Sequence, residues 1–330
     1  MTAPNPPFET RTLRYGTAAI AEAARVIAAG EPVAAPTETV YGLAADATDS
    51  DAVARIYEAK GRPSFNPLIV HLPDLAAAER IAVFDARARA LAAAFWPGPL
   101  TLVLPLRPEA GISPLVTAGL GTIALRVPAH RAMRALLEAT GKPLAAPSAN
   151  ASNRISPTRA EHVLASLDGR IALVIDDGPT SAGLESTIVK DGEILRPGPI
   201  TAADIEAVCS RQGGSPGSRA AAPGKPGPRL GGSTGEIVAP GQLASHYAPS
   251  KPLRLDATTA APDEWLIGFG AVAGDDMLSA SGDLAEAAAR LFDALHVADA
   301  SPRPRIAVAP IPDAGVGAAI NDRLRRAAHG

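Results

Sequence analysis

The chain has little of what several classes of protein require. Its single cysteine, Cys209, excludes an internal disulfide and any zinc site built from thiolates, and it suits a reducing compartment. No apolar run approaches the roughly 18 residues that a transmembrane helix needs. The N-terminal residues, MTAPNPPFETR, lack the basic and apolar regions of a signal peptide. These absences predict a cytoplasmic protein without a membrane partner.

An excess of positive charge is also missing. The 330 residues include 31 Lys and Arg against 34 Asp and Glu, and the pI is about 6.1. Residues 1–211 carry 20 basic and 22 acidic side chains, a net charge of −2, and aromatic and basic residues do not alternate there. Proteins that hold nucleic acid by bulk charge need a basic surface. Charge therefore argues against a double-stranded RNA-binding module, which is the alternative from a non-enzymatic class.

Signatures of several enzyme classes are missing as well. The glycines before Ser233 and Thr234 are not followed by the lysine of a GxxxxGK[ST] phosphate-binding loop. The chain contains no HExxH metal motif and no GxSxG nucleophile elbow. P-loop nucleotidases, zinc proteases and serine hydrolases are therefore not supported.

The composition that is present is typical of a globular α/β protein, with 47% hydrophobic and 20% charged residues. Strand and helix patterns alternate without strict βαβ order, which favours a mixed sheet over a doubly wound one. The patterns predict strands at 32–35, 68–72, 100–106, 122–127, 172–175, 186–190, 193–195, 252–255, 265–269 and 305–309. They predict helices at 17–29, 50–60, 85–95, 129–139, 159–167, 201–210, 284–297 and 316–328.

A change of composition divides the chain. Residues 212–245 contain nine Gly, five Pro and four Ser, too few apolar side chains to offset the entropy of ordering. We expect a large domain over 1–211, a Gly/Pro-rich linker over 212–250 and a small α/β domain over 251–330. The linker is either a flexible tether or a loop that orders on a ligand.

Short polar segments stand beside several apolar runs. Thr37 and Thr39 follow the run at 32–35, Lys60 and Arg62 end a predicted helix, and His71 lies in an apolar strand. Singly, such residues more often form turns or caps than sites. Together they indicate a site that binds anions.

Two arginines strengthen this interpretation. Arg126 lies within the apolar run TIALRVP, and Arg196 lies within EILRPG. A partly buried guanidinium needs an anionic partner, from the protein or from a ligand. The polar segments contain cations and hydroxyls but few carboxylates. This composition predicts a pocket that binds the phosphates and the carboxylate of its ligands.

A series of motifs then supports a specific resemblance. They are PTETVYGL at 36–43, KGRP at 60–63, NPLIVHL at 66–72, WPGPLTLVL at 96–104, TIALRVP at 122–128, APSAN at 146–150, SNRISPT at 152–158, LESTIV at 184–189 and ILRPG at 194–198. Their order and spacing resemble the YrdC-like domain of the threonylcarbamoyl-AMP synthase family. HYAP at 246–249 is similar to the linker motif of the long form of that family, which carries a small C-terminal domain.

The resemblance implies a fold and a reaction. The fold is α/β, a YrdC-like twisted mixed sheet with a concave cavity, followed by a small Rossmann-like domain. The reaction joins L-threonine, bicarbonate or CO2, and ATP into threonylcarbamoyl-adenylate and releases pyrophosphate. A downstream threonylcarbamoyl transferase complex would then modify tRNA, so tRNA is only an indirect partner.

The resemblance also implies site residues. Those expected to hold threonine are Thr39, His71, Arg126, Ala146 and Ser186. Those expected to hold ATP are Lys60, Arg62, Asn66, Thr122, Ser148, Asn150, Ser156, Arg196 and Tyr247. Lys60 and Arg62 are expected to be catalytic at the phosphates, and Mg2+ is expected to accompany ATP through ligands that the motifs do not identify.

A second enzymatic alternative is a carbamoyl transferase related to hydrogenase maturation, whose longer chains contain a similar domain. The zinc-finger segments of such chains need cysteines, and this chain has one. Pyrophosphate release that requires both threonine and bicarbonate would separate the three hypotheses.

The aromatic HYAP motif further predicts that the linker closes over the cavity and shields a labile anhydride from water.

Overall fold

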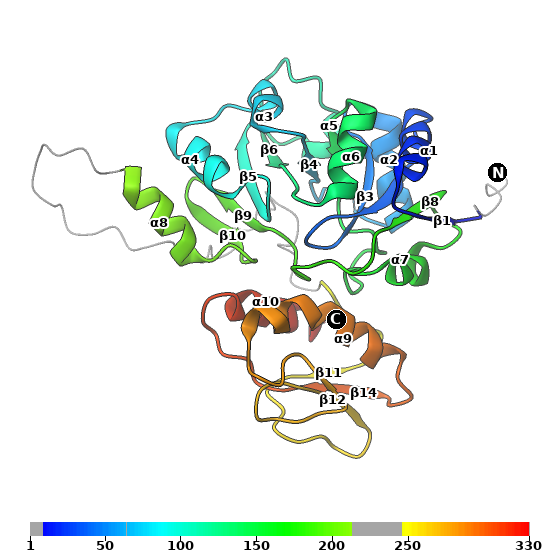
Figure 1. Ribbon diagram of the computed structural model, residues 1–330, viewed down its shortest axis with the longest axis vertical. Coiled ribbons are helices and arrows are strands. Elements are labelled where there is room, and N and C mark those ends of the chain that lie inside the picture. The colour runs from blue at the N-terminus through cyan, green and yellow to red at the C-terminus, as the bar shows by residue number, and fades with distance from the viewer. Residues whose placement is uncertain (1–8, 64, 213–245, 330) are drawn as a thin grey trace, which may run out of the picture.

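The molecule consists of a large and a small α/β domain (Figure 1). It is described by a computed structural model that covers residues 9–63, 65–212 and 246–329. The predicted linker, 212–250, therefore lies mostly outside the described residues, and the predicted domain boundaries stay a prediction. The predicted fold class, a mixed sheet followed by a small α/β domain, is confirmed. None of the described helices is long and apolar enough to cross a membrane.

A ten-stranded sheet forms the large domain, in the order β1-β8-β2-β3-β7-β4-β6-β5-β9-β10. It is mixed, because β4 and β6 pair in parallel whereas β5 and β6 pair antiparallel. The strands are β1 (Arg11–Arg14), β2 (Val33–Pro36), β3 (Tyr41–Asp46), β4 (Ile69–His71), β5 (Leu100–Pro105), β6 (Thr122–Arg126), β7 (Leu144–Ala145), β8 (Leu173–Asp176), β9 (Thr187–Lys190) and β10 (Glu193–Arg196).

Local signals explain where the helices of this domain start and stop. Asp49 caps α2 by accepting a hydrogen bond from the Asp51 amide at 2.9 Å, and Gly61 ends the helix with φ 57°. The start and the stop predicted for this helix are thus confirmed. The helices are α1 (Thr17–Ala28), α2 (Ser50–Lys60), α3 (Leu75–Ile81), α4 (Ala86–Phe95), α5 (Pro114–Thr117), α6 (Arg131–Thr140), α7 (Ala160–Leu167) and α8 (Ala202–Gln212).

Five elements of the large domain, β1, β3, β7, α3 and α5, were not predicted, and β7 has only two residues. β1 reads RTLR and lies at the sheet edge with a mostly exposed pattern, so it has no apolar run. β3 reads YGLAAD, and Gly and Ala are poor strand formers whose place here comes from pairing on both sides. The helices α3 and α5 have only seven and four residues, too few for a clear periodicity.

The two faces of the sheet are covered unequally. Because side chains alternate along β2, Ala34 points to one face of the sheet, and Val33 and Ala35 point to the other. The core on the Ala34 face is covered by α2, α3, α4, α7 and α8. The core on the opposite face lies beneath α1 and α6. This second face continues over β4, β5, β6 and β9 as a small cluster of Ile69, Val103, Ala124 and Ile188. Among the described residues, no helix of the large domain contributes to that cluster. The sheet is therefore open on this half of one face.

The small domain has a four-stranded parallel sheet in the order β11-β14-β12-β13. Its two helices pack their apolar sides on the sheet, with Leu291, Phe292 and Ile320 fully buried. The elements are β11 (Leu253–Arg254), β12 (Glu264–Gly268), β13 (Asp276–Met277), α9 (Leu284–Ala300), β14 (Arg305–Val308) and α10 (Gly317–Ala327). Of these, only β13 was not predicted, because it has two residues.

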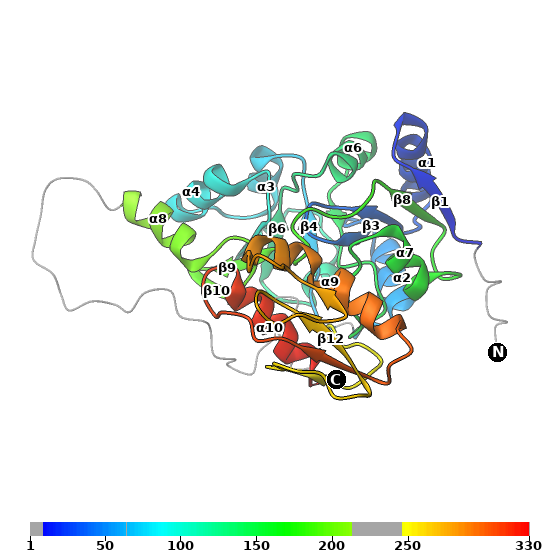
Figure 2. The same ribbon diagram turned by 60° about the horizontal axis from the view of Figure 1, so that its bottom comes forward.

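Helices α9 and α10 face the large domain (Figures 1 and 2). Val40, Ile155 and Leu184 of the large domain belong to the core of the small one. A Cβ atom at Gly183 would lie only 2.4 Å from the Ala289 carbonyl oxygen of α9, so the close approach requires glycine. The domain interface is therefore closely packed.

A pair of stacked histidines crosses the same interface. The rings of His162 and His296 lie 3.8 Å apart at 19°, and His296 Nε2 lies 3.2 Å from the Ser156 carbonyl oxygen. Asp293 accepts from Arg159 Nε at 2.6 Å and lies 3.6 Å from His162 Nε2. Burial, and secondly the neighbouring His296, lowers the pKa of His162 to about 3, and burial also lowers the pKa of His296.

We expect this pair to make stability depend on pH. The folded protein keeps both rings neutral, whereas the unfolded chain takes up protons near pH 6.5. The free energy of unfolding should thus be fully retained above about pH 6.5 and should fall as the pH drops toward the folded pKa of about 3 for His162.

Denaturant unfolding across this pH range checks the expectation. His162→Gln should flatten the slope, and a matched change of the exposed His329 to Gln should leave it unchanged. An unaltered slope in His162→Gln would show that the stacked pair does not carry the pH dependence.

Candidate active site

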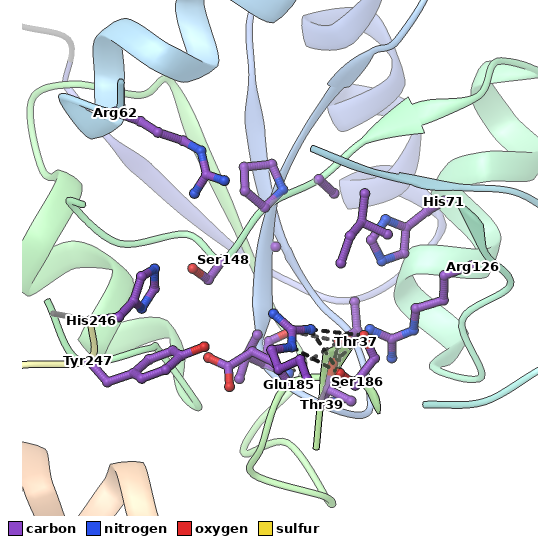
Figure 3. Close-up of a pocket in the computed structure, with 16 residues that line it drawn as sticks. Thr37, Thr39, Arg62, His71, Arg126, Ser148, Glu185, Ser186, His246 and Tyr247 are labelled. Carbon is purple, nitrogen blue, oxygen red and sulfur yellow. Dashed lines mark hydrogen bonds between the residues drawn. The ribbon is translucent and has the colours of Figure 1, made fainter. Parts of the chain in front are cut away.

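An open cavity of about 520 Å³ lies over the helix-free half of the sheet (Figure 3). Most of the predicted site residues line it: Thr39, Arg62, His71, Arg126, Ala146, Ser148, Ser186, Arg196 and Tyr247. Strand geometry explains much of this. Parallel pairing sets His71 opposite Arg126 at the carboxyl ends of β4 and β6, and alternation turns both toward the open face.

Arg126 is held firmly at one side of the cavity. Its Nη2 donates to Glu38 Oε1 at 2.5 Å, its Nη1 to Thr39 Oγ1 at 2.9 Å, and its Nε to the Gly98 carbonyl at 3.2 Å. The other Glu38 oxygen accepts from the Ala129 amide at 3.0 Å. Burial alone raises the pKa of Glu38, but the Arg126 guanidinium holds it below its ordinary value, so the carboxylate stays ionised. Arg126 is thus oriented before any ligand binds.

His71 adds a neutral group next to this arginine. Burial, and secondly the charge of Arg126, lowers its pKa to about 3, so the ring is uncharged at neutral pH. Both ring nitrogens are buried without a hydrogen-bond partner among the described residues. A buried imidazole that lacks partners is expected to bind a polar ligand.

Ser186 and Arg196 form a second polar pair in the wall. Arg196 Nη2 donates to the Ser186 carbonyl at 2.9 Å and to Ser186 Oγ at 3.1 Å, and Ser186 Oγ lies 2.7 Å from Thr101 Oγ1. Burial lowers the pKa of Arg196 from its ordinary value. Backbone carbonyl and hydroxyl groups therefore orient this guanidinium toward the cavity.

Lys60 lies just behind the lining, because its Nζ donates to the carbonyls of Ser148 and Asn150. It is buried and, among the described residues, has no carboxylate partner. Burial, and secondly the charge of Arg62, lowers the pKa of its ammonium group well below the ordinary value. A buried lysine in this state is expected to gain strongly from a nearby anion.

Arg62 lies on the opposite side of the cavity from Arg126 (Figure 3). It donates from Nη2 to the Pro67 carbonyl at 3.1 Å, and burial lowers its pKa to about 10, so it remains cationic at neutral pH. Thr122 is the first residue of β6, where it pairs with Pro105 of β5, and it does not line the cavity.

The remaining predicted residues are close to the cavity without lining it. The Asn66 side-chain oxygen is buried without a partner among the described residues, and the same holds for that of Asn150. Asn150 Nδ2 donates to the Arg154 carbonyl at 2.8 Å. Ser156 Oγ donates to Glu185 Oε1 at 2.5 Å, so it reaches the lining through that carboxylate.

Glu185 is a carboxylate within an otherwise cationic lining, and the sequence reasoning missed it. Its Oε2 accepts from Arg323 Nε of the small domain at 2.8 Å. Glu38, Thr37 and His246 are further residues at the site to which no role was assigned. All four residues lie inside motifs that the sequence shows: Thr37 and Glu38 in PTETVYGL, Glu185 in LESTIV and His246 in HYAP. Their place in these motifs is the signal that could have identified them.

The donor set does not form a cage for a metal ion. No group of three or more His, Cys, Asp or Glu residues is suitably placed within 9–63, 65–212 and 246–329. Both oxygens of Glu185 are already occupied by Ser156 and Arg323. A divalent ion at this site would depend on oxygens from its ligand and from water, as Mg2+ commonly does.

Geometry and charge together define a class of protein. The cavity is open, and its cations come from the ends of buried strands and of a helix. Its polar groups are preoriented, and several have no hydrogen-bond partner in the described part of the chain. The fold and site are those of a two-domain α/β enzyme that binds small anionic substrates.

Comparison with known proteins identifies the family. Residues 25–198 match the family model described as telomere recombination, and residues 200–329 match that of the threonylcarbamoyl-AMP synthase C-terminal domain. The threonylcarbamoyl-AMP synthase of Bacillus subtilis is 42% identical over 94% of this chain and 93% of its own. That of Pyrococcus abyssi is 38% identical over 92% of each. The crystal structure of P. abyssi Sua5 complexed with L-threonine has a TM-score of 0.84 and 36% identity, covering 96% of this chain and 97% of that one.

The chain belongs to the threonylcarbamoyl-AMP synthase family, in its long form with the C-terminal domain. The resemblance read from the motifs is thereby confirmed, and so is the prediction of an enzyme. The individual site residues stay a prediction.

Proposed function

We propose that this enzyme makes L-threonylcarbamoyl-adenylate from L-threonine, bicarbonate or CO2, and ATP, and releases pyrophosphate. The observation that carries the proposal is one cavity with Arg126 on one side and Arg62 on the other. The first suits an amino-acid carboxylate, and the second suits phosphates. Membership of the family supports the same activity.

The Arg126 side is proposed to bind threonine. A guanidinium already fixed by Glu38 and Thr39 can direct its remaining N–H groups to a carboxylate. His71, uncharged and without a partner, offers a polar contact to the substrate. Ala146 and Ser186 complete this part of the lining. The known complex of P. abyssi Sua5 with L-threonine supports the substrate.

The Arg62 side is proposed to bind ATP. Arg62 and Lys60 would neutralise the phosphates, together with Arg196 and Ser148 of the same lining. The unpartnered oxygens of Asn66 and Asn150 and the buried Tyr247 hydroxyl suit the nucleoside. Thr122 and Ser156 would support these groups from behind the lining. Mg2+ is proposed to arrive with ATP and to be held mainly by the phosphates and water.

Positioning is proposed to accomplish most of the catalysis. Threonine carbamate carries a nucleophilic carboxylate oxygen, so no strong general base is needed. That oxygen attacks the α-phosphorus, the bond to the bridging oxygen breaks, and pyrophosphate leaves with the electron pair. Fixed cations stabilise the charge that develops on the phosphates.

The product is a reactive mixed anhydride, and we propose that a downstream threonylcarbamoyl transferase complex consumes it to modify tRNA. The tRNA is then an indirect partner, in agreement with the net negative charge of the chain. The cytoplasm is the proposed compartment, because the single cysteine suits a reducing environment.

Pyrophosphate release tests the proposal directly. ATP should be converted only when threonine and bicarbonate are both present, and replacing threonine with each other standard amino acid in turn should reduce the rate sharply. A carbamoyl transferase would instead consume carbamoyl phosphate, and an RNA-binding module would release no pyrophosphate. Release that is independent of threonine or of bicarbonate would contradict the proposed reaction.

A further inference from the structure

Arg323 of the small domain reaches the candidate active site. It lies on α10 and is 0% exposed, which is unusual for an arginine. Its Nε donates to Glu185 Oε2 at 2.8 Å, and its Nη1 to the neighbouring Asp322 at 2.7 Å. Its Nη2 is buried with no partner among the described residues. The buried charge is thus directed at a residue of the cavity lining.

The segment around Glu185 depends on the small domain at successive positions. Gly183 lies against the backbone of α9, Leu184 is fully buried in the small domain's core, and Glu185 pairs with Arg323. The next residue, Ser186, enters the cavity and contacts Arg196. The position of this part of the lining is therefore set from the small domain.

Tyr247 is held by the same arginine. The Arg323 guanidinium carbon lies 5.2 Å from the centre of its ring, and the Phe292 ring centre lies 5.5 Å away on another side. The Tyr247 hydroxyl is buried and has no partner among the described residues. Glu185 and the Tyr247 hydroxyl come close together in the cavity (Figure 3).

A carboxylate in this cavity would repel phosphates if its charge were not compensated. Arg323 supplies the compensating charge, and Ser156 hydrogen-bonds the other carboxylate oxygen. Removing one partner of a buried ion pair leaves the other charge desolvated and unpaired, which is strongly unfavourable. The pair therefore influences both the orientation and the net charge of the nucleotide side of the site.

We propose that Arg323 is a positioning residue of the reaction, which acts from the C-terminal domain by holding Glu185 and Tyr247 against the nucleotide. The inference rests on the proposed function, because it assumes that ATP occupies this side of the cavity. The C-terminal domain is then a part of the active site and more than an appended module.

ATP affinity and turnover in Arg323→Met test the proposal. The Michaelis constant for ATP should rise by about tenfold or more, whereas that for threonine should change little. The effect should also depend on pH, because an unpaired Glu185 repels phosphates until it takes up a proton. ATP affinity of the variant should therefore improve as the pH falls, and the parent should not share this trend.

Two further variants separate positioning from general damage. Arg323→Met combined with Glu185→Gln removes both charges, and it should recover part of the ATP affinity and lose the added pH dependence. Arg159→Met breaks a different interdomain ion pair, with Asp293, outside the cavity lining, and it should leave the Michaelis constant for ATP unchanged. A merely structural Arg323 would give equal losses in Arg323→Met and Arg159→Met, with no rescue, and this result would overturn the proposal.

The parent enzyme provides the separate check on the proposed function. If it releases no pyrophosphate with threonine and bicarbonate, the proposed reaction fails. The role of Arg323 is judged separately, from the ATP affinity of Arg323→Met relative to that of the parent. Should Arg323→Met not fold, Arg323→Gln, which also removes the charge, carries the test. Unchanged ATP affinity in that variant would also overturn the proposal.

Discussion

Replacing Arg62 with methionine is expected to lower threonine-dependent pyrophosphate release by about a hundredfold or more at saturating ATP, because a fixed cation facing the phosphates is lost. Arg62 is partly buried, lines the cavity and remains cationic, with a pKa of about 10. Methionine keeps most of the side-chain volume but has no N–H group for the triphosphate. Lys60→Met should act in the same direction, since it removes both a charge and the support of the Ser148 carbonyl.

A matched variant keeps this prediction specific. Arg80 is an exposed arginine on α3, and Arg80→Met should behave like the parent. Thermal unfolding of each variant verifies that the fold is retained. Turnover near the parent level in Arg62→Met, at saturating ATP, would exclude Arg62 from the phosphate site.

Arg126→Lys is expected to raise the Michaelis constant for threonine by about tenfold or more while changing that for ATP little. The guanidinium bonds Glu38, Thr39 and the Gly98 carbonyl and still has N–H groups for a carboxylate. A lysine keeps the charge but cannot reproduce this planar arrangement of donors. Steady-state kinetics with each substrate varied in turn measures the two constants.

Glu38→Gln is the companion variant. It retains an oxygen that can accept from Arg126 but removes the charge that orients the guanidinium, so it should weaken threonine binding less than Arg126→Lys does. Equal effects of Arg126→Lys on both substrates would mean that this arginine serves the phosphates or the fold and does not select threonine.

The sequence predicted the elements whose signals are local. The helix predicted at 50–60 matches α2, whose ends Asp49 and Gly61 fix, and the apolar runs at 68–72, 100–106 and 122–127 match β4, β5 and β6. It also predicted that Arg126 would need an anionic partner. The identity of that partner could not be read from the chain, because Glu38 meets Arg126 only through pairing of distant strands.

The contribution of the small domain was harder to predict. A basic run of Arg323, Arg325 and Arg326 at a helix end is normally a solvated group that favours the helix dipole. Arg325 is exposed, as this general rule expects, whereas Arg323 is fully buried against Glu185. Which side of a helix faces another domain depends on tertiary packing, and a short helical pattern does not contain that information.

Carbonyl groups hold Lys60 in place, and no carboxylate among the described residues pairs with it. Burial thus disfavours the charged form of its ammonium group in the free protein, and under the proposed function a bound nucleotide would stabilise that charge. Such a group works against the stability of the free protein, as strained functional sites commonly do. Variants selected for thermal resistance alone would be expected to replace Lys60 early, and activity would disappear as the melting temperature rose.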